Sequence, residues 1–515
     1  MKSRRRSAFL VSTGLVKAVG RTTGPDTPSG MRQQGRPRHD NGPLALLKAE
    51  IDAFLCRHGR RPRVLAADTG GRRRPAAVRR LASALADMGF DVDLAPDGLH
   101  PDALTGMALE NDVHFVFAIV DPSEADTAGF QALSAAGIQL VAADAVGDWR
   151  WFLEQDMQQD KGAVYRHLAA EFGPRLTKIA VRRNPPAYFI EGVLAGNRRI
   201  LAQGLTLMES TQKDHRKCAK AVIRALLPKT GQALRMGISG VPGVGKSTFI
   251  ESFGQRLIRK GHRVAVLAVD PSSVRNGGSI LGDKTRMTGL SSMPRAFVRP
   301  SPAGGALGGV ADRTRECMVL CEAAGFDVVI VETVGVGQSE ISVASMVDFF
   351  LVLMLAGAGD EIQGIKKGIL ELADAVAVNK ADGDNVEAAG DARRDYESAL
   401  TLLSPSYANW RTPVLTCSAV TGEGLDETWE VVQAHQQALY ASGELPEKRR
   451  QQALAWMQDL VEEGLQERLL NHPQVVQRLP QIVDKVVQGD MLATQAAREI
   501  LALADTGLPG AETGE

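Results

Sequence analysis

The chain has 515 residues, of which 44% are hydrophobic and 23% charged, and its 60 basic and 60 acidic side chains leave a formal net charge of zero. This is the composition of a globular protein too long for one domain, so two or three domains are expected. The charge balance argues against a general nucleic-acid binder, and no apolar run reaches the length of a membrane span. Neither nucleic acid nor a membrane is therefore expected as a partner.

The cysteines indicate a reducing compartment. Five of them are scattered along the chain without a C-x-x-C pair or a disulfide framework, which favours a cytoplasmic protein. Cys317 and Cys321 could share a helix face, but no histidine lies nearby in the sequence, so we expect no metal site there.

Residues 1–44 are rich in Lys, Arg, Gly, Pro, Ser and Thr. Their basic start and short apolar patch resemble a signal or transit peptide, but Lys17 interrupts the patch and no small-residue cleavage site follows. We therefore expect either a disordered basic tail or a start codon placed too early.

Residues 45–147 alternate strand and helix patterns, which predicts a small parallel α/β domain. One helix face is formed by Val78, Leu81, Ala82, Leu85 and Met88. The predicted strands are 63–68, 91–95, 113–120 and 138–142.

Residues 148–187 are predicted to be a linker, because Phe172-Gly173-Pro174 and Asn184-Pro185-Pro186 interrupt any long helix. A helical segment, 188–228, is expected to lead into a second α/β domain, 229–440.

The strands predicted in this second α/β domain, besides the strand end at Met236–Ser239, are 264–269, 327–331, 349–355, 375–378 and 414–416. Residues 441–515 are predicted to form a C-terminal helical segment. Their first helix carries an apolar stripe of Leu454, Met457, Val461, Leu465 and Leu469.

The segment Gly240–Ser247 reads GVPGVGKS and fits the phosphate-binding pattern G-x-x-x-x-G-K-[ST] at every fixed position. Its glycines let backbone N–H groups point at phosphate oxygens, and a helix beginning near Thr248 would add its N-terminal dipole. Lys246 is predicted to contact the β- and γ-phosphates and Ser247 to bind Mg²⁺. The remaining positions predicted to bind the nucleotide are Gly240, Val241, Pro242, Gly243, Val244, Gly245 and Thr248.

A second motif, Asn379-Lys380-Ala381-Asp382, follows a predicted strand and indicates a guanine nucleotide. Asp382 can accept hydrogen bonds from N1–H and the 2-amino group of guanine, a donor pair that adenine lacks. The stem of Lys380 can lie against the base. Ser418, Ala419 and Val420, after the next strand, are predicted to supply backbone N–H groups to the guanine O6 atom.

Acidic residues at strand ends complete the predicted site. Asp270 and Glu332 each end a predicted strand, where a parallel sheet places its ligand groups. With Ser247 and Asp283 they are the candidate Mg²⁺ ligands, directly or through water. Gly335, in Glu332-Thr333-Val334-Gly335, could sense the γ-phosphate as a switch does.

The strings VDPSS, GGSILGDKTRM, RPSP, ETVGVGQSE, GIKKG and NKAD, in this order, resemble the MeaB/ArgK-type GTPases, from about Phe189 to about Leu503. The resemblance implies a P-loop fold, GTP as substrate, Mg²⁺, a homodimer formed through the C-terminal helices, and a cobalamin-dependent acyl-CoA mutase as partner. It places Lys246, Glu332 and Lys366 in catalysis.

The resemblance also places a switch that couples nucleotide state to the mutase in GDEIQGIKKG, at Asp360, Gln363 and Lys366. Gln338 is predicted to belong to the switch as well, and it is a candidate for the residue that positions the attacking water.

Residues 45–147 resemble the flavodoxin-like cobalamin-binding domain of acyl-CoA mutases. That family carries D-x-H-x-x-G after the first strand, whereas this chain has Asp68, then Gly70 and Arg73 at the His and final Gly positions. Gly70 cannot coordinate cobalt, so cobalamin is not expected to bind there. This degenerate domain is expected to contact the mutase or to remain as an inherited structural element.

The sequence thus predicts a GTP-hydrolysing chaperone that gates cobalamin loading and protection of an acyl-CoA mutase such as methylmalonyl-CoA mutase. The alternative is a cobalamin-binding sensor or regulatory protein with a GTPase switch. A third hypothesis, an accessory of basic amino-acid transport, has no supporting feature in the sequence.

Overall fold

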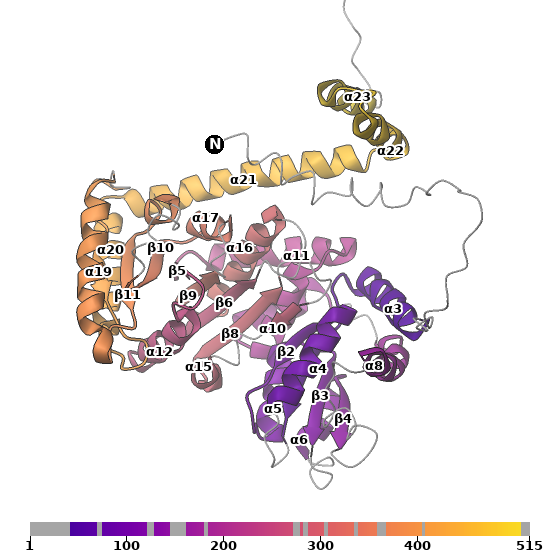
Figure 1. Ribbon diagram of the computed structural model, residues 1–515, viewed down its shortest axis with the longest axis horizontal. Coiled ribbons are helices and arrows are strands. Elements are labelled where there is room, and N and C mark those ends of the chain that lie inside the picture. The colour runs from indigo at the N-terminus through magenta and orange to yellow at the C-terminus, as the bar shows by residue number, and fades with distance from the viewer. Residues whose placement is uncertain are drawn as a thin grey trace, which may run out of the picture. The chain divides into compact units, whose positions relative to one another are not determined.

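The computed structural model (Figure 1) arranges its strands in two parallel sheets that belong to one compact unit, residues 39–452. The predicted α/β class with parallel sheets is therefore confirmed. We call residues 42–179 the N-terminal subdomain and residues 184–452 the second subdomain. The described residues are 42–69, 75–120, 128–144, 161–179, 184–270, 279–281, 287–302, 307–333, 338–357, 367–403 and 407–505.

The sheet of the N-terminal subdomain has the order β4-β3-β1-β2-β7, in which β2-β1-β3-β4 is the flavodoxin-like arrangement. The four strands predicted here are confirmed to within about two residues, because strands buried on both faces read as apolar runs. The fifth, β7, was not predicted, and it comes from the second subdomain. The strands are β1 (Arg63–Asp68), β2 (Asp91–Leu94), β3 (Phe115–Val120), β4 (Gln139–Asp144) and β7 (Ser279–Leu281).

Helices cover this sheet through apolar faces. All five residues of the predicted face of α4 are buried. The helices of this subdomain are α3 (Gly42–His58), α4 (Pro75–Met88), α5 (Pro101–Glu110), α6 (Ala128–Ala135) and α8 (Lys161–Leu176).

Helix α8 corrects one expectation. It runs through Phe172-Gly173-Pro174, where an interruption was expected, and Pro174 lies only three residues from its end. Phe172 is fully buried and packs its ring on Phe90 and Phe115. Burial of that ring offsets the hydrogen bond that a proline removes from a helix.

The end of α3 holds a buried histidine whose titration should affect stability. The His58 ring is 7% exposed and stacks on Phe54, and burial, with further repulsion from Arg60 and Arg57, lowers its pKa from 6.5 to about 4. His58 therefore stays neutral in the fold at pH 5, while the unfolded chain binds a proton there, so stability falls as the pH drops from 6.5 toward 4.

We accordingly expect His58→Gln to reduce the acid sensitivity of the chain. Between pH 7 and pH 5 the wild type should lose roughly 1–2 kcal/mol more unfolding free energy than the variant does. Urea unfolding of both proteins at the two pH values measures this difference, and equal losses would contradict the prediction.

The sheet of the second subdomain has the order β12-β11-β10-β5-β9-β6-β8. Strand β8 was not predicted, because its sequence AFVRPSP contains a charge and two prolines, which an edge strand tolerates. All other strands were predicted. They are β5 (Leu234–Gly240), β6 (Val264–Asp270), β8 (Ala296–Pro302), β9 (Val328–Thr333), β10 (Phe349–Leu355), β11 (Ala375–Asn379) and β12 (Val414–Thr416).

Helices pack on both faces of this sheet, as in a doubly wound fold. One core joins the strands to α10, α11 and α16, and the other joins them to α12 and α20. The helices are α9 (Pro186–Leu194), α10 (Arg198–Glu209), α11 (Lys213–Leu226), α12 (Lys246–Arg259), α15 (Thr288–Ser292), α16 (Leu307–Ala323), α17 (Gln338–Ala344), α18 (Lys367–Leu370), α19 (Val386–Thr401) and α20 (Leu425–Ala441), with short 3₁₀ turns η1 (Leu227–Lys229) and η2 (Gly383–Asn385).

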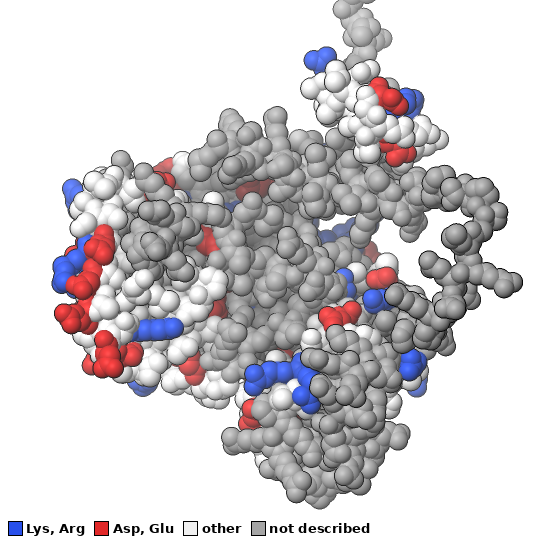
Figure 2. All heavy atoms as spheres, in the orientation of Figure 1, with Lys and Arg blue, Asp and Glu red and all other residues white. Residues whose placement is uncertain are grey.

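Both signs of charge are interspersed on the surface over α19 (Figure 2), where Arg393 pairs with Glu397 and Arg394 with Asp391. This face is therefore not a basic patch of the kind that binds nucleic acid.

The chain ends in α21 (Glu444–Leu470), α22 (Pro473–Gln488) and α23 (Ala493–Asp505), and residues 453–505 belong to a separate helical unit. In this unit α22 and α23 pack together, whereas the predicted stripe of α21 is largely exposed, as at Val461 (55%) and Leu465 (59%). Among the described residues, no helix is long and apolar enough to span a membrane.

Candidate nucleotide-binding site

The loop between β5 and α12 has the geometry that its sequence requires. Strand β5 ends at Gly240 and α12 begins at Lys246, so the predicted strand–loop–helix context is confirmed. Gly240, Gly243 and Gly245 adopt φ of 151°, 82° and 92°, values that favour glycine. A Cβ on Gly240 would also lie 2.4 Å from the Leu353 carbonyl oxygen of β10. The loop can therefore turn tightly against the sheet and present its backbone.

The side chain of Lys246 lies along this loop. Its Nζ atom donates to the carbonyl oxygens of Gly240 at 2.8 Å and Val241 at 3.3 Å, and the residue is 9% exposed. The ammonium group is thus held at the start of the loop whose N–H groups would surround phosphates. Thr248, one residue after the motif, is exposed on the first turn of α12.

The fold brings two of the predicted metal ligands together. Ser247 Oγ donates to Glu332 Oε1 at 2.9 Å, although the residues are 85 positions apart. Both side chains are buried, with exposures of 6% and 5%. The backbone of Asp270 ends β6 at the same sheet edge, because β6 pairs with β9 in the register Ala268↔Glu332. Hard oxygen donors at one edge are the set that Mg²⁺ prefers, so these residues fit the ion.

The remaining predicted metal and switch residues lie wholly or partly outside the described part of the structure. Gln338 begins α17, but its side chain lies outside the described part of the structure. Entirely outside the described residues are Asp283, Gly335, Asp360, Gln363 and Lys366.

Asn379 ties the two nucleotide motifs to each other. Its Nδ2 atom donates to the Val244 carbonyl of the loop at 2.8 Å, and its Oδ1 atom accepts from Ala419 N at 3.1 Å. Lys380 takes a left-handed φ of 62°, which is costly for a non-glycine residue, and its Nζ donates to the Gly243 carbonyl at 2.9 Å. The lysine side chain therefore reaches the loop between β5 and α12.

The predicted base-reading residues form a connected cluster. Ser418 Oγ donates to Asp382 Oδ2 and accepts from the N–H groups of Val420 at 3.2 Å and Thr421 at 3.0 Å. Two of the N–H groups predicted to face guanine O6 therefore donate to side chains of the protein: Ala419 N to Asn379 Oδ1 and Val420 N to Ser418 Oγ. The Val420 side chain is 80% exposed.

One buried contact at the site was not predicted. Thr333 Oγ1 donates to Ser239 Oγ at 2.9 Å, and both residues are 1% exposed. The contact holds the ends of β5 and β9 together beside the loop. In the sequence, Ser239 directly precedes the glycine-rich loop and Thr333 directly follows Glu332, but nothing there indicates that the two side chains meet.

A separate cavity of about 1080 Å³ lies between the N-terminal subdomain and helices α9 to α11. It is lined by residues such as Arg60, Asp112 and Thr206, and no residue of the glycine-rich loop contacts it. The groups of the glycine-rich loop, with its Ser247–Glu332 contact, match the chemistry of a triphosphate, so the candidate nucleotide site is this loop and not the cavity.

The chain is similar to known GTPases. Residues 201–474 match the family model described as "Methylmalonyl Co-A mutase-associated GTPase MeaB". A Caulobacter vibrioides protein described as a GTPase is 53% identical over 310 residues, which cover 60% of this chain and 95% of that protein. The mitochondrial methylmalonic aciduria type A homolog of Mus musculus is 45% identical over 320 residues, covering 60% of this chain and 77% of its own.

The fold has a solved counterpart. The crystal structure of an LAO/AO transport system kinase superposes with a TM-score of 0.52 and 40% identity, covering 63% of this chain and 99% of that one. The family model begins at residue 201, so the N-terminal subdomain lies outside the region that it matches.

Proposed function

The chain belongs to the MeaB family of methylmalonyl-CoA mutase-associated GTPases, and from this premise we propose that its GTPase cycle gates cobalamin loading and protection of an acyl-CoA mutase. The observation that carries the proposal is the family match together with the Ser247–Glu332 contact beside the glycine-rich loop. GTP hydrolysis is the activity of the family, and the residue roles below are our assignment.

Residues of the loop would bind and orient the triphosphate. Backbone N–H groups of the loop would surround the phosphates at the N-terminus of α12, and Lys246 would offset negative charge that develops during phosphoryl transfer. Ser247 and Glu332, with Asp270 and Asp283, would hold Mg²⁺, which supplies charge stabilisation and orients the phosphates when bound. Lys366 would add a second positive charge, and Gln338 or another polar group would position the attacking water.

The cluster around Asp382 would select guanine. Ser418 and Asn379 position Asp382 and the adjoining turn against the loop, so the carboxylate is fixed before the base arrives. Preorganised acceptors discriminate strongly, because a base without matching donors leaves them unpaired.

The mutase is proposed as the client because both the family model and the mouse relative carry methylmalonyl or methylmalonic names. In this proposal Gly335, Asp360, Gln363 and Lys366 change conformation with the nucleotide and transmit its state to the client.

Size-exclusion chromatography tests the client proposal. The full chain is mixed with methylmalonyl-CoA mutase in the presence of GDP or of a non-hydrolysable GTP analogue, and transfer of adenosylcobalamin to apo-mutase is followed by absorbance. We expect co-elution with a transfer rate that differs between the two nucleotides. No co-elution with either nucleotide, and no effect on transfer, would exclude this mutase as the client.

The exposed stripe of α21 supports a homodimer formed through the C-terminal helices. An apolar row of this kind is stabilised when a second copy covers it. Sedimentation velocity of the full chain would detect the dimer, and a monomer at micromolar concentration would contradict it.

The five free cysteines are consistent with the cytoplasmic location that we propose.

We further propose that the N-terminal subdomain does not take up cobalamin through a histidine ligand. Asp68 is 2% exposed at the end of β1, and Gly70, which stands at the expected histidine position, lies outside the described residues. An absorbance titration of the full chain with adenosylcobalamin decides this point. Stoichiometric binding would favour the alternative, a cobalamin sensor with a GTPase switch.

A further inference from the structure

The chain crosses between the two sheets at a point close to the nucleotide site. After β6 ends at Asp270, the chain leaves the second sheet and forms β7 beside β2 of the N-terminal subdomain, in the parallel register Asp91↔Ser279 to Asp93↔Leu281. It then returns to the second sheet as β8, which pairs with β6 in the register Asp270↔Pro302. The N-terminal subdomain therefore pairs with a strand that lies, in the sequence, between β6 and β8, and β6 ends at the metal-ligand candidate Asp270.

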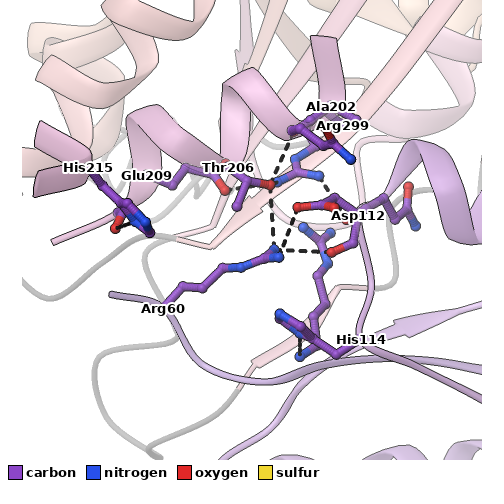
Figure 3. Close-up of polar contacts among 12 residues, drawn as sticks. Arg60, Asp112, His114, Ala202, Thr206, Glu209, His215 and Arg299 are labelled. Carbon is purple, nitrogen blue, oxygen red and sulfur yellow. Dashed lines mark hydrogen bonds and ion pairs between the residues drawn. The ribbon is translucent and has the colours of Figure 1, made fainter. Parts of the chain in front are cut away.

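A buried arginine makes a second attachment between the subdomains (Figure 3). Arg299 of β8 is 1% exposed, and its Nη1 atom donates to the Asn111 carbonyl, at the end of α5, at 2.9 Å. Its Nη2 atom donates to Thr206 Oγ1 at 3.0 Å and to Glu209 Oε2 at 2.9 Å, both on α10. A charge buried this deeply is stable only while all its partners stay in place, so the network fixes the positions of three elements.

The turn that Arg299 contacts, residues 110–112, is also held by Arg60 of the N-terminal subdomain and by Arg198 of the second subdomain. Asp112, in the same turn, has a left-handed φ of 48° and pairs with Arg60 at 2.8 Å. Glu110 accepts from Arg198 Nε at 2.8 Å, while Arg198 Nη1 donates to the Pro294 carbonyl at 2.9 Å, just before β8. Both Arg198 and Arg299 thus connect residues 110–112 to β8.

These contacts argue against a loosely tethered N-terminal subdomain. A mobile docking module would meet its neighbour through exposed, hydrated polar groups, whereas here a fully buried guanidinium and a shared strand pairing join it to the second subdomain. The attached strand, β8, lies directly beside β6, whose last residue is the metal-ligand candidate Asp270. Movement of the N-terminal subdomain would therefore displace β8 and the end of β6.

We propose that the N-terminal subdomain is an intramolecular effector of the GTPase, which sets the rate of hydrolysis by positioning β8 and the end of β6. Arg198 and Arg299 are positioning residues in this arrangement, and β7 is the strand through which the subdomain holds the connection. The proposal rests on the GTPase activity of the family and is independent of the identity of the client.

The first test alters the N-terminal subdomain alone. In Glu110→Ala the full chain loses the acceptor that the N-terminal subdomain offers to Arg198 Nε, whereas Glu110→Gln keeps an oxygen acceptor there. We expect Glu110→Ala to lower kcat about tenfold with the KM for GTP changed less than about twofold, because positioning rather than binding is lost. Glu110→Gln should restore most of the rate, and Glu397→Ala, which breaks an exposed ion pair on α19, should match the wild type.

Hydrogen exchange supplies a readout that does not depend on turnover. Peptides covering residues 264–302 should exchange faster in Glu110→Ala than in Glu110→Gln. A variant that melts at a lower temperature but keeps both the wild-type kcat and the wild-type exchange at 264–302 would overturn the proposal.

The second test alters β7. Successive N–H groups of a strand point to opposite sides, so one of Ile280→Pro and Leu281→Pro must remove a group that faces β2. That variant should show the same fall in kcat and faster exchange at β2, and Ile280→Val should show neither. Wild-type exchange at β2 in both proline variants would overturn the role of β7. Hydrolysis is measured without any mutase, so failure here is distinguishable from failure of the client proposal.

Discussion

Replacing Lys246 by alanine is expected to lower the kcat of GTP hydrolysis by a factor of about 10² or more, a typical loss when a preorganised electrostatic group is removed from a phosphoryl-transfer site. The Nζ atom of Lys246 is held within 2.8 Å of the Gly240 carbonyl, so the charge occupies a defined position at the start of the loop. Within the sequence of the loop, residues 240–247, no other lysine or arginine is present.

Steady-state phosphate release measures this effect. The matched control is Lys260→Ala, at the other end of α12, where the lysine is 43% exposed and pairs with Asp426. Its loss should leave the rate within about twofold of the wild type, because exposed ion pairs contribute little. Hydrolysis by Lys246→Ala at the control rate would refute the assignment of this site.

Replacing Asp382 by asparagine is expected to lower kcat/KM for GTP by a factor of about 10² to 10³, because two charge-assisted hydrogen bonds to guanine are lost or weakened. The same change should raise kcat/KM for xanthosine triphosphate. Xanthine presents a carbonyl at position 2, and the asparagine amide can donate to it, while N1–H still finds an acceptor. Specificity should therefore invert rather than merely weaken.

The control for this prediction is Asp384→Asn, two positions along the chain, where the carboxylate is exposed in η2. It should leave both substrates unaffected. Equal hydrolysis of ATP and GTP by the wild type would already contradict the role of Asp382, and an Asp382→Asn variant with unchanged GTP preference would place base recognition elsewhere.

The strands and the nucleotide motifs were accessible from the sequence because each is encoded locally. Apolar runs such as 349–355 become strands buried on both faces, and the spacing of glycines around Lys246 already dictates a tight loop before a helix. The resemblance to GTPases could be recognised from the same short strings, and the family model and the relatives confirm it.

Long-range contacts were not accessible in this way. Ser247 meets Glu332 across 85 positions, and Asn379 joins Val244 to Ala419. The sequence marked each residue as part of a site, but the sheet order β5-β9-β6 decides which of them touch.

The relation between the two subdomains was decided only by the tertiary structure. Strand β8 does not show the apolar pattern of a strand, because Arg299 and two prolines interrupt its apolar run. Arg299 can be buried there because it donates to the Asn111 carbonyl, 188 positions away, and to Glu209, 90 positions away. By itself the sequence determined the chemistry of a GTP site, since phosphate and base recognition depend on contiguous motifs. That the N-terminal subdomain is joined to this site through β7 and β8 follows from pairing and burial between distant segments, which no local pattern records.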